Sequence, residues 1–75
     1  MIERIEINPD ICHGKPVIKN TRVLVSNILA ELADGLKIEE IKENYPQINE
    51  DDLIAALRFG SLLAQFETIN FGKAS

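Results

Sequence analysis

The residues whose types could support chemistry begin with the adjacent pair Cys12 and His13. A structural zinc site takes about four ligands, whereas this chain holds one cysteine and one histidine. A Cys–His nucleophile pair needs converging side chains, and neighbours in an extended segment point to opposite sides. The pair therefore predicts neither a metal site nor a thiol nucleophile. A single cysteine also forms no internal disulfide, which favours a cytoplasmic protein.

The next two residues, Gly14 and Lys15, resemble the end of a phosphate-binding loop. Such a loop has a glycine five positions earlier, where this chain has Pro9, and a serine or threonine after the lysine, where it has Pro16. The carboxylates that remain fall at expected helix starts or on solvent faces: Glu39, Glu40, Glu43, Asp51 and Asp52. Nothing in the pattern brings two of them into an apolar pocket, so general acid–base catalysis has no support. The sequence predicts a protein that is not an enzyme and uses no cofactor.

Charge is distributed unevenly along the 75 residues, whose net charge is −4. Residues 31–52 hold two lysines against eight acidic residues, a balance of −6, and the segments on either side each balance to +1. A basic segment over 11–22 contains Lys15, Lys19 and Arg22 and no acid. Either these are two solvated faces, or they are two surfaces for different partners.

Length and hydropathy limit the class of protein. A chain of 75 residues forms one domain, buries about 60% of its unfolded surface and is expected to gain stability from a partner chain. The longest apolar run, Leu53–Leu57, is far shorter than the roughly 20 residues that span a bilayer. The N-terminus alternates charged and aliphatic residues, so we expect no secretory signal and no membrane partner.

Residue periodicity predicts a mainly α domain with a small N-terminal β unit. A strand over 2–7 and a hairpin over 16–25, with Asn20 in its turn, form the predicted β unit, 1–25. A three-helix core follows over 26–66. Its first helix has Ser26 as N-cap and ends at a left-handed Gly35. The second covers 38–45 and stops at Pro46, and the third runs from Glu50, after the N-cap Asn49, to about Gln65. Residues 67–75 form an extended tail.

The third helix has two apolar stripes. The broader one is expected to pack on the first two helices and contains Leu53, Ile54, Ala56, Leu57, Gly60, Leu63 and Ala64. The second stripe is either covered by the hairpin of the same chain or left open for a partner. In the tail, residues 68–71 alternate polar and apolar, as a strand added to another protein's sheet edge would. The second stripe and the tail together define the predicted partner interface: Ala55, Phe59, Leu62, Phe66, Ile69 and Phe71.

Three helices of these lengths also match a helix-turn-helix domain in outline. The exposed side of the second helix is mainly carboxylate, and the third helix begins with three acids, which repel phosphate. We therefore expect any DNA contact to come from Lys15, Lys19 and Arg22 in the hairpin. Three phosphate contacts per chain are weak and would need a dimer or a basic partner.

The run from Cys12 to Val23 carries a family resemblance together with three later motifs. These motifs are Leu32-Ala33-Asp34-Gly35, Tyr45-Pro46, and Glu50-Asp51-Asp52-Leu53 with the alanines that follow. Over about residues 5–64 the chain resembles the bacterial family called domain of unknown function 433. The most specific part is Gly-Lys-Pro-x-Ile-x-x-Thr-Arg, in which Asn20 replaces the family's usual glycine.

The resemblance implies a homeodomain-like helix-turn-helix domain after a small β unit. Members often look like antitoxins encoded beside PIN-like ribonuclease toxins, in systems similar to VapBC. The leading hypothesis is therefore an antitoxin-like binding module that neutralises a PIN-like toxin and autoregulates its operon by binding operator DNA. One alternative is a DNA-binding transcriptional regulator. The other is a homodimeric structural module that associates through Phe59, Leu62 and Phe66.

Overall fold

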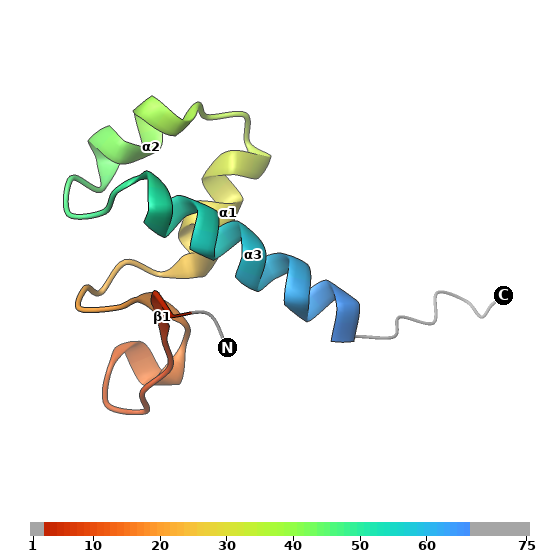
Figure 1. Ribbon diagram of the computed structural model, residues 1–75. Helices are drawn as coiled ribbons and strands as arrows, with labels where there is room; N and C mark the ends of the chain where they lie inside the picture. The colour runs from red at the N-terminus through yellow and green to blue at the C-terminus, as the bar shows by residue number, and fades with distance from the viewer. Residues whose placement is uncertain (1–2, 67–75) are drawn as a thin grey trace, which may run out of the picture.

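Two short antiparallel pairings organise the N-terminal part of the computed structural model, which describes residues 3–66 (Figure 1). β1 (Ile5–Glu6) pairs with β2 (Val17–Ile18), with Ile5 opposite Ile18. On its other side β2 meets the 23–25 segment, where the Ile18 amide donates to the Val23 carbonyl at 3.0 Å. The predicted small β unit with a hairpin is therefore confirmed, although its first strand is shorter than expected.

Asn20 and Thr21 form the turn of the hairpin. Asn20 has a φ of 65°, the left-handed region that asparagine tolerates better than most residues. The Thr21 hydroxyl donates to the Ile18 carbonyl at 2.7 Å and accepts from the Val23 amide at 3.0 Å. These bonds link the main chain on the two sides of the turn, so a threonine is suited to this position.

The left-handed turn gives a stability prediction at Asn20. Asn20→Gly is expected to change the free energy of unfolding by less than about 0.5 kcal/mol, because glycine adopts this φ without steric cost. Asn20→Val is expected to lower it by about 1–2 kcal/mol, because a β-branched residue is strained there. Urea unfolding of the two variants measures the difference. Equal effects of glycine and valine would contradict the turn.

Helix α1 (Val25–Ala33) begins two residues earlier than the predicted N-cap Ser26 requires, because its N-cap is Leu24. That prediction is wrong because the chain passes from the bridge at Leu24 directly into the helix, where the Pro16 carbonyl accepts from the Val25 amide at 3.0 Å. The predicted end is confirmed. Gly35 has a φ of 92°, and the Leu36 amide donates to the Glu31 carbonyl at 3.0 Å, as in a Schellman motif.

Helices α2 (Ile38–Asn44) and α3 (Glu50–Phe66) match their predicted bounds closely. At the start of α2 the Glu40 carboxylate accepts from the Lys37 amide at 2.7 Å. At the start of α3, Asn49 Oδ1 accepts from the Asp52 amide at 2.9 Å, and Asp52 Oδ2 accepts from the Asn49 amide at 3.0 Å. This reciprocal capping box defines where α3 begins.

A single apolar core joins the β unit to the three helices. Helix α3 packs on α1, α2 and β1. The core residues come from every element: Ile5, Ile18, Val23, Val25, Ile28, Ile41, Ile48, Leu53, Ala55 and Ala56. No helix within residues 3–66 is long and apolar enough to cross a membrane.

The predicted assignment of the α3 faces is wrong at several positions. Ala55, expected in the partner interface, is only 7% exposed, and Phe59 packs against the core. Ile54 and Leu57, expected in the core, are 41% and 48% exposed. The reason is that β1 also packs on α3, which turns the Ala55 side of the helix inward. Part of the second stripe is thus covered by its own chain.

Candidate functional site

The second half of α3 extends beyond the body of the protein (Figure 1). Gly60 lies close to α1, where an added Cβ would be 3.2 Å from Leu29 Cδ1. Beyond it every described side chain is exposed. We call residues 61–66 the distal segment. Phe66 ends the helix, and the structure does not describe its side chain. The predicted interface residues Ile69 and Phe71, and the predicted tail, lie outside the described residues.

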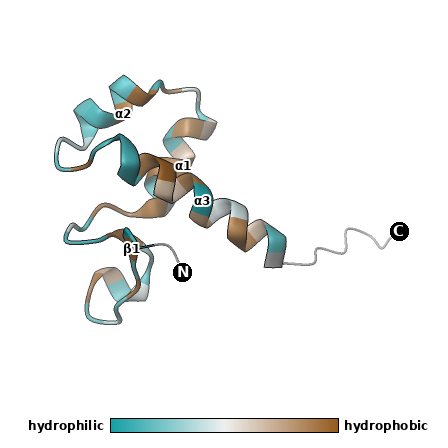
Figure 2. Ribbon diagram, viewed as in Figure 1, coloured by the Kyte–Doolittle hydropathy of each residue, from teal (hydrophilic) through white to brown (hydrophobic). Residues whose placement is uncertain are grey.

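Two leucines make the distal segment apolar. Leu62 is 38% exposed and Leu63 is 47% exposed, and Figure 2 shows a second patch of apolar colour on the part of α3 that lies past the body. Leu63 lies one turn after Phe59 and two turns after Ala56, on the side of α3 that faces the core. The core-facing stripe therefore continues into a region where its leucine side chains are exposed. Such a stripe is typical of a helix that inserts into a partner.

An acidic surface lies away from the distal segment. Glu39, Glu40 and Glu43 are exposed on α2, and Glu50 and Asp51 are exposed in the first turn of α3. Figure 2 shows the hydrophilic colour along much of α2 and at the start of α3. The acidic surface and the apolar distal segment are therefore separate features of the molecule, as the uneven charge of the sequence indicates.

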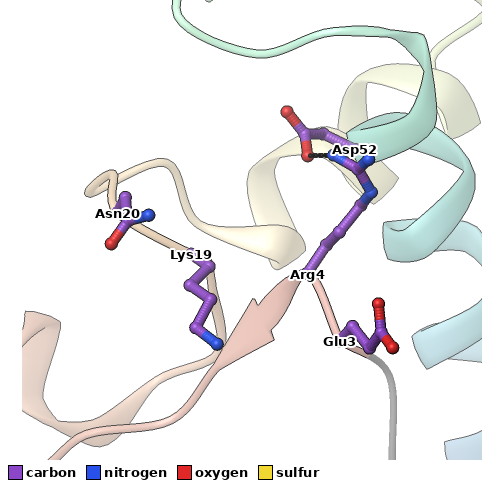
Figure 3. Close-up of a pocket in the computed structure, with 5 residues that line it drawn as sticks. All are labelled: Glu3, Arg4, Lys19, Asn20 and Asp52. Atoms are coloured by element: carbon purple, nitrogen blue, oxygen red, sulfur yellow. Dashed lines mark hydrogen bonds and ion pairs between the residues drawn. The ribbon is translucent and has the colours of Figure 1, made fainter.

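The predicted DNA contacts Lys15, Lys19 and Arg22 are all exposed. Lys19 lines an open hollow of about 400 Å³ together with Glu3, Arg4, Asn20 and Asp52 (Figure 3), and Arg22 lines another with Glu6. The carboxylates beside these cations weaken their positive potential. The structure brings the three residues to one β unit without forming a purely basic surface.

Arg4 and Asp52 form an ion pair between the N-terminal unit and α3 (Figure 3). Arg4 Nη1 donates to Asp52 Oδ1 at 3.0 Å, and Arg4 Nη2 lies 3.7 Å from Asp51 Oδ2. Asp52 lies at the start of α3, as predicted, but it is buried, with only 8% of its surface exposed. Both of its oxygens are used, one by Arg4 and one by the α3 cap, and its role is to hold β1 against α3.

Glu31 joins the end of α2 to α1. Its carboxylate accepts from the Tyr45 hydroxyl at 2.8 Å and from Asn44 Nδ2 at 3.2 Å. The hydrogen bond to Glu31, then burial and the negative charge of Glu31, raise the pKa of Tyr45 above its ordinary value. Deprotonation would place a phenolate beside a carboxylate, so the neutral hydroxyl is favoured.

This contact predicts a loss of stability at alkaline pH. The folded-state pKa of Tyr45 is raised. The contribution of the Tyr45–Glu31 hydrogen bond to the free energy of unfolding is therefore complete below the unfolded pKa of about 10, and it is lost as pH rises through the folded pKa. Tyr45→Phe is expected to lower the free energy of unfolding by about 1 kcal/mol at pH 7, with a smaller difference near pH 11. The chain has one tyrosine, so phenolate absorbance reports its titration directly. Glu31→Gln should lower the observed pKa, and an unchanged value would contradict the assignment.

Residues 12–14 form a single turn whose backbone is left-handed throughout. Cys12, His13 and Gly14 have φ values of 50°, 59° and 80°. Cys12 Sγ lies 3.9 Å from the Arg22 carbonyl, and His13 is exposed. Within the described part of the chain, no three residues of the types that ligate metals lie close enough to hold an ion.

Comparison with known proteins assigns the chain to a family. The family model described as "Protein of unknown function (DUF433)" matches residues 5–60. The chain belongs to the DUF433 family. The crystal structure of a DUF433 member from Anabaena variabilis superposes with a TM-score of 0.77 and 32% sequence identity, over 83% of this chain and 61% of that one. An uncharacterized protein of Sinorhizobium fredii, y4eO, is 32% identical over 63 residues, 84% of this chain. This chain corresponds to only 27% of the length of y4eO.

The DUF433 motif is used mainly by the fold. Gly14 and Asn20 occupy left-handed positions, and Ile18 is buried. Thr21 bonds the main chain of the hairpin. Sequence reasoning found these residues through the motif but missed the Arg4–Asp52 pair, whose members are 48 positions apart. Its only local signal was the Asn-x-x-Asp spacing at the start of α3.

Proposed function

We propose that this DUF433 chain is an antitoxin-like binding module, without catalysis of its own, that neutralises a PIN-like ribonuclease. The observation that carries the proposal is the distal segment of α3, in which Leu62 and Leu63 continue the core stripe beyond the body. A helix in this arrangement buries its apolar side when a partner supplies a groove. Burial of two leucines favours binding by about 3–5 kcal/mol before the costs of association.

The acidic surface supports a nucleic-acid-binding enzyme as the partner. A ribonuclease that binds RNA presents cations to phosphate, and the exposed carboxylates of α2 and of the first turn of α3 complement such cations. Complementary charge speeds association and disfavours partners of the same charge. The family resemblance to antitoxins points to the same class of partner.

Co-expression with the PIN-like protein of the adjacent reading frame tests the proposal. We expect the two chains to elute together on gel filtration and the ribonuclease activity of the partner to fall in the complex. Separate elution of two folded proteins, or a complex with undiminished ribonuclease activity, would contradict neutralisation.

Binding to operator DNA is a second candidate function, and it rests on the exposed Lys15, Lys19 and Arg22. None of the three forms an ion pair with another residue in the described range 3–66. If each contacts one phosphate in a dimer, the logarithm of affinity for upstream DNA should fall with the logarithm of salt concentration with a slope of about −5. Lys19→Gln should reduce the slope for every sequence alike. An affinity that does not depend on salt would exclude this function.

A further inference from the structure

The outer face of α3 carries an ordered set of exposed side chains. At about 100° per residue, Asp51, Ile54, Leu57 and Arg58 fall within an arc of about 120°, on the side of the helix opposite to its buried residues. All four are exposed. This face includes neither Leu62 nor Leu63 of the distal segment, although it shares Asp51 with the acidic surface.

The charges at the two ends of this face lack a close partner within residues 3–66. Arg58 forms no ion pair there, and the only ion pair of Asp51 is the 3.7 Å approach to Arg4, whose main partner is Asp52. Asp51 and Arg58 are seven residues apart, which is two turns or about 10 Å along the helix. Between them the surface is aliphatic, at Ile54 and Leu57.

We propose that a second copy of this chain docks on the outer face of α3 in an antiparallel, two-fold symmetric arrangement. With the axis beside Ile54, midway between Asp51 and Arg58, each Arg58 lies opposite the Asp51 of the other copy. The two Ile54 side chains meet near the axis, and Leu57 of each copy extends the apolar contact. The order acid, aliphatic, base is self-complementary under this symmetry, and this selects a second copy as the occupant.

The same arrangement keeps like charges apart. The two Arg58 side chains are separated by about 10 Å along the helix pair, as are the two Asp51 side chains. The antiparallel arrangement also opposes the two helix dipoles. The face is small compared with the roughly 800 Å² per partner of a stable interface, and each chain has a net charge of −4. The dimer is therefore weak, and its association depends on concentration.

A charge-swap experiment tests the interface. Sedimentation equilibrium at protein concentrations up to about 1 mM and 0.15 M salt, where screening reduces the general repulsion, should show a monomer–dimer equilibrium for the wild-type chain. Arg58→Asp and Asp51→Arg should each lower the association constant by about tenfold or more. In the double variant Asp51→Arg/Arg58→Asp the association constant of the dimer should recover to within about threefold of the wild-type value. Glu43→Arg on α2 is the control and should leave the dimer intact.

Three outcomes would overturn the proposal: a wild-type chain that stays monomeric at about 1 mM, single variants that dimerise like wild type, or a double variant as weak as the singles. Ile54→Asp tests the apolar contact at the axis, because it places two carboxylates together there. We expect it to abolish the dimer, while thermal unfolding shows that the fold is kept. Leu63→Asp should leave the dimer unchanged, because Leu63 lies on the side of α3 opposite to this face, and this separates the interface from the one proposed for the ribonuclease.

Discussion

Replacing Asp52 with alanine is expected to lower the free energy of unfolding by about 2 kcal/mol, or the melting temperature by about 10 °C. The buried carboxylate accepts from Arg4 and from the Asn49 amide. Alanine removes the ion pair that holds β1 against α3 and also leaves the first turn of α3 without half of its capping box. Arg4 remains partly exposed, and solvation of its guanidinium limits the loss.

Asp51→Ala is the matched control for this prediction. Asp51 is the neighbouring acid in the same helical turn, its side chain is 71% exposed, and it lies 3.7 Å from Arg4. Exposed ion pairs contribute about 0–1 kcal/mol, so this variant should unfold nearly like wild type in urea. If both variants lost the same stability, general charge at the helix start rather than the Asp52 contacts would hold the unit together.

The double variant Leu62→Asp/Leu63→Asp is expected to lower affinity for the ribonuclease partner by at least about 1,000-fold. Two buried leucines are lost, and two carboxylates would have to be desolvated in an apolar groove. Stability of the free chain should change by less than about 1 kcal/mol, because both side chains are exposed. Isothermal titration calorimetry of the co-purified partner measures the loss.

The control for this variant adds the same charge at other exposed apolar residues. Ile7 and Ile38 are 54% and 37% exposed and lie in the N-terminal unit and at the start of α2. Ile7→Asp/Ile38→Asp should bind within about threefold of wild type. A similar loss in both double variants would show that net charge, and not the distal segment, determines affinity.

Local signals predicted the helices of this protein well because each end has a short-range cause. The left-handed Gly35 ends α1, and the Asn49 cap begins α3, as the residue types indicate. Ser26 failed as a cap because a main-chain bond from Pro16 to Val25 starts the helix earlier. That bond depends on how the hairpin pairs, which residue type alone does not determine.

The orientation of α3 could not be predicted for a different reason. Its sequence is apolar on two sides, so periodicity gives the relative angles of the side chains but not which side faces inward. Packing of β1, far away in sequence, decides the matter and buries Ala55 while exposing Ile54 and Leu57. The left-handed backbone at Cys12 and His13 had no residue signal either, since only the following Gly14 favours a positive φ.

Hydrogen exchange of the chain alone and in complex with the neighbouring PIN-like protein tests the central claim most directly. The account predicts that amides of the distal segment, residues 61–66, exchange quickly in the free chain and become strongly protected in the complex. Protection confined to the hairpin or to α2, with unchanged exchange in residues 61–66, would contradict it.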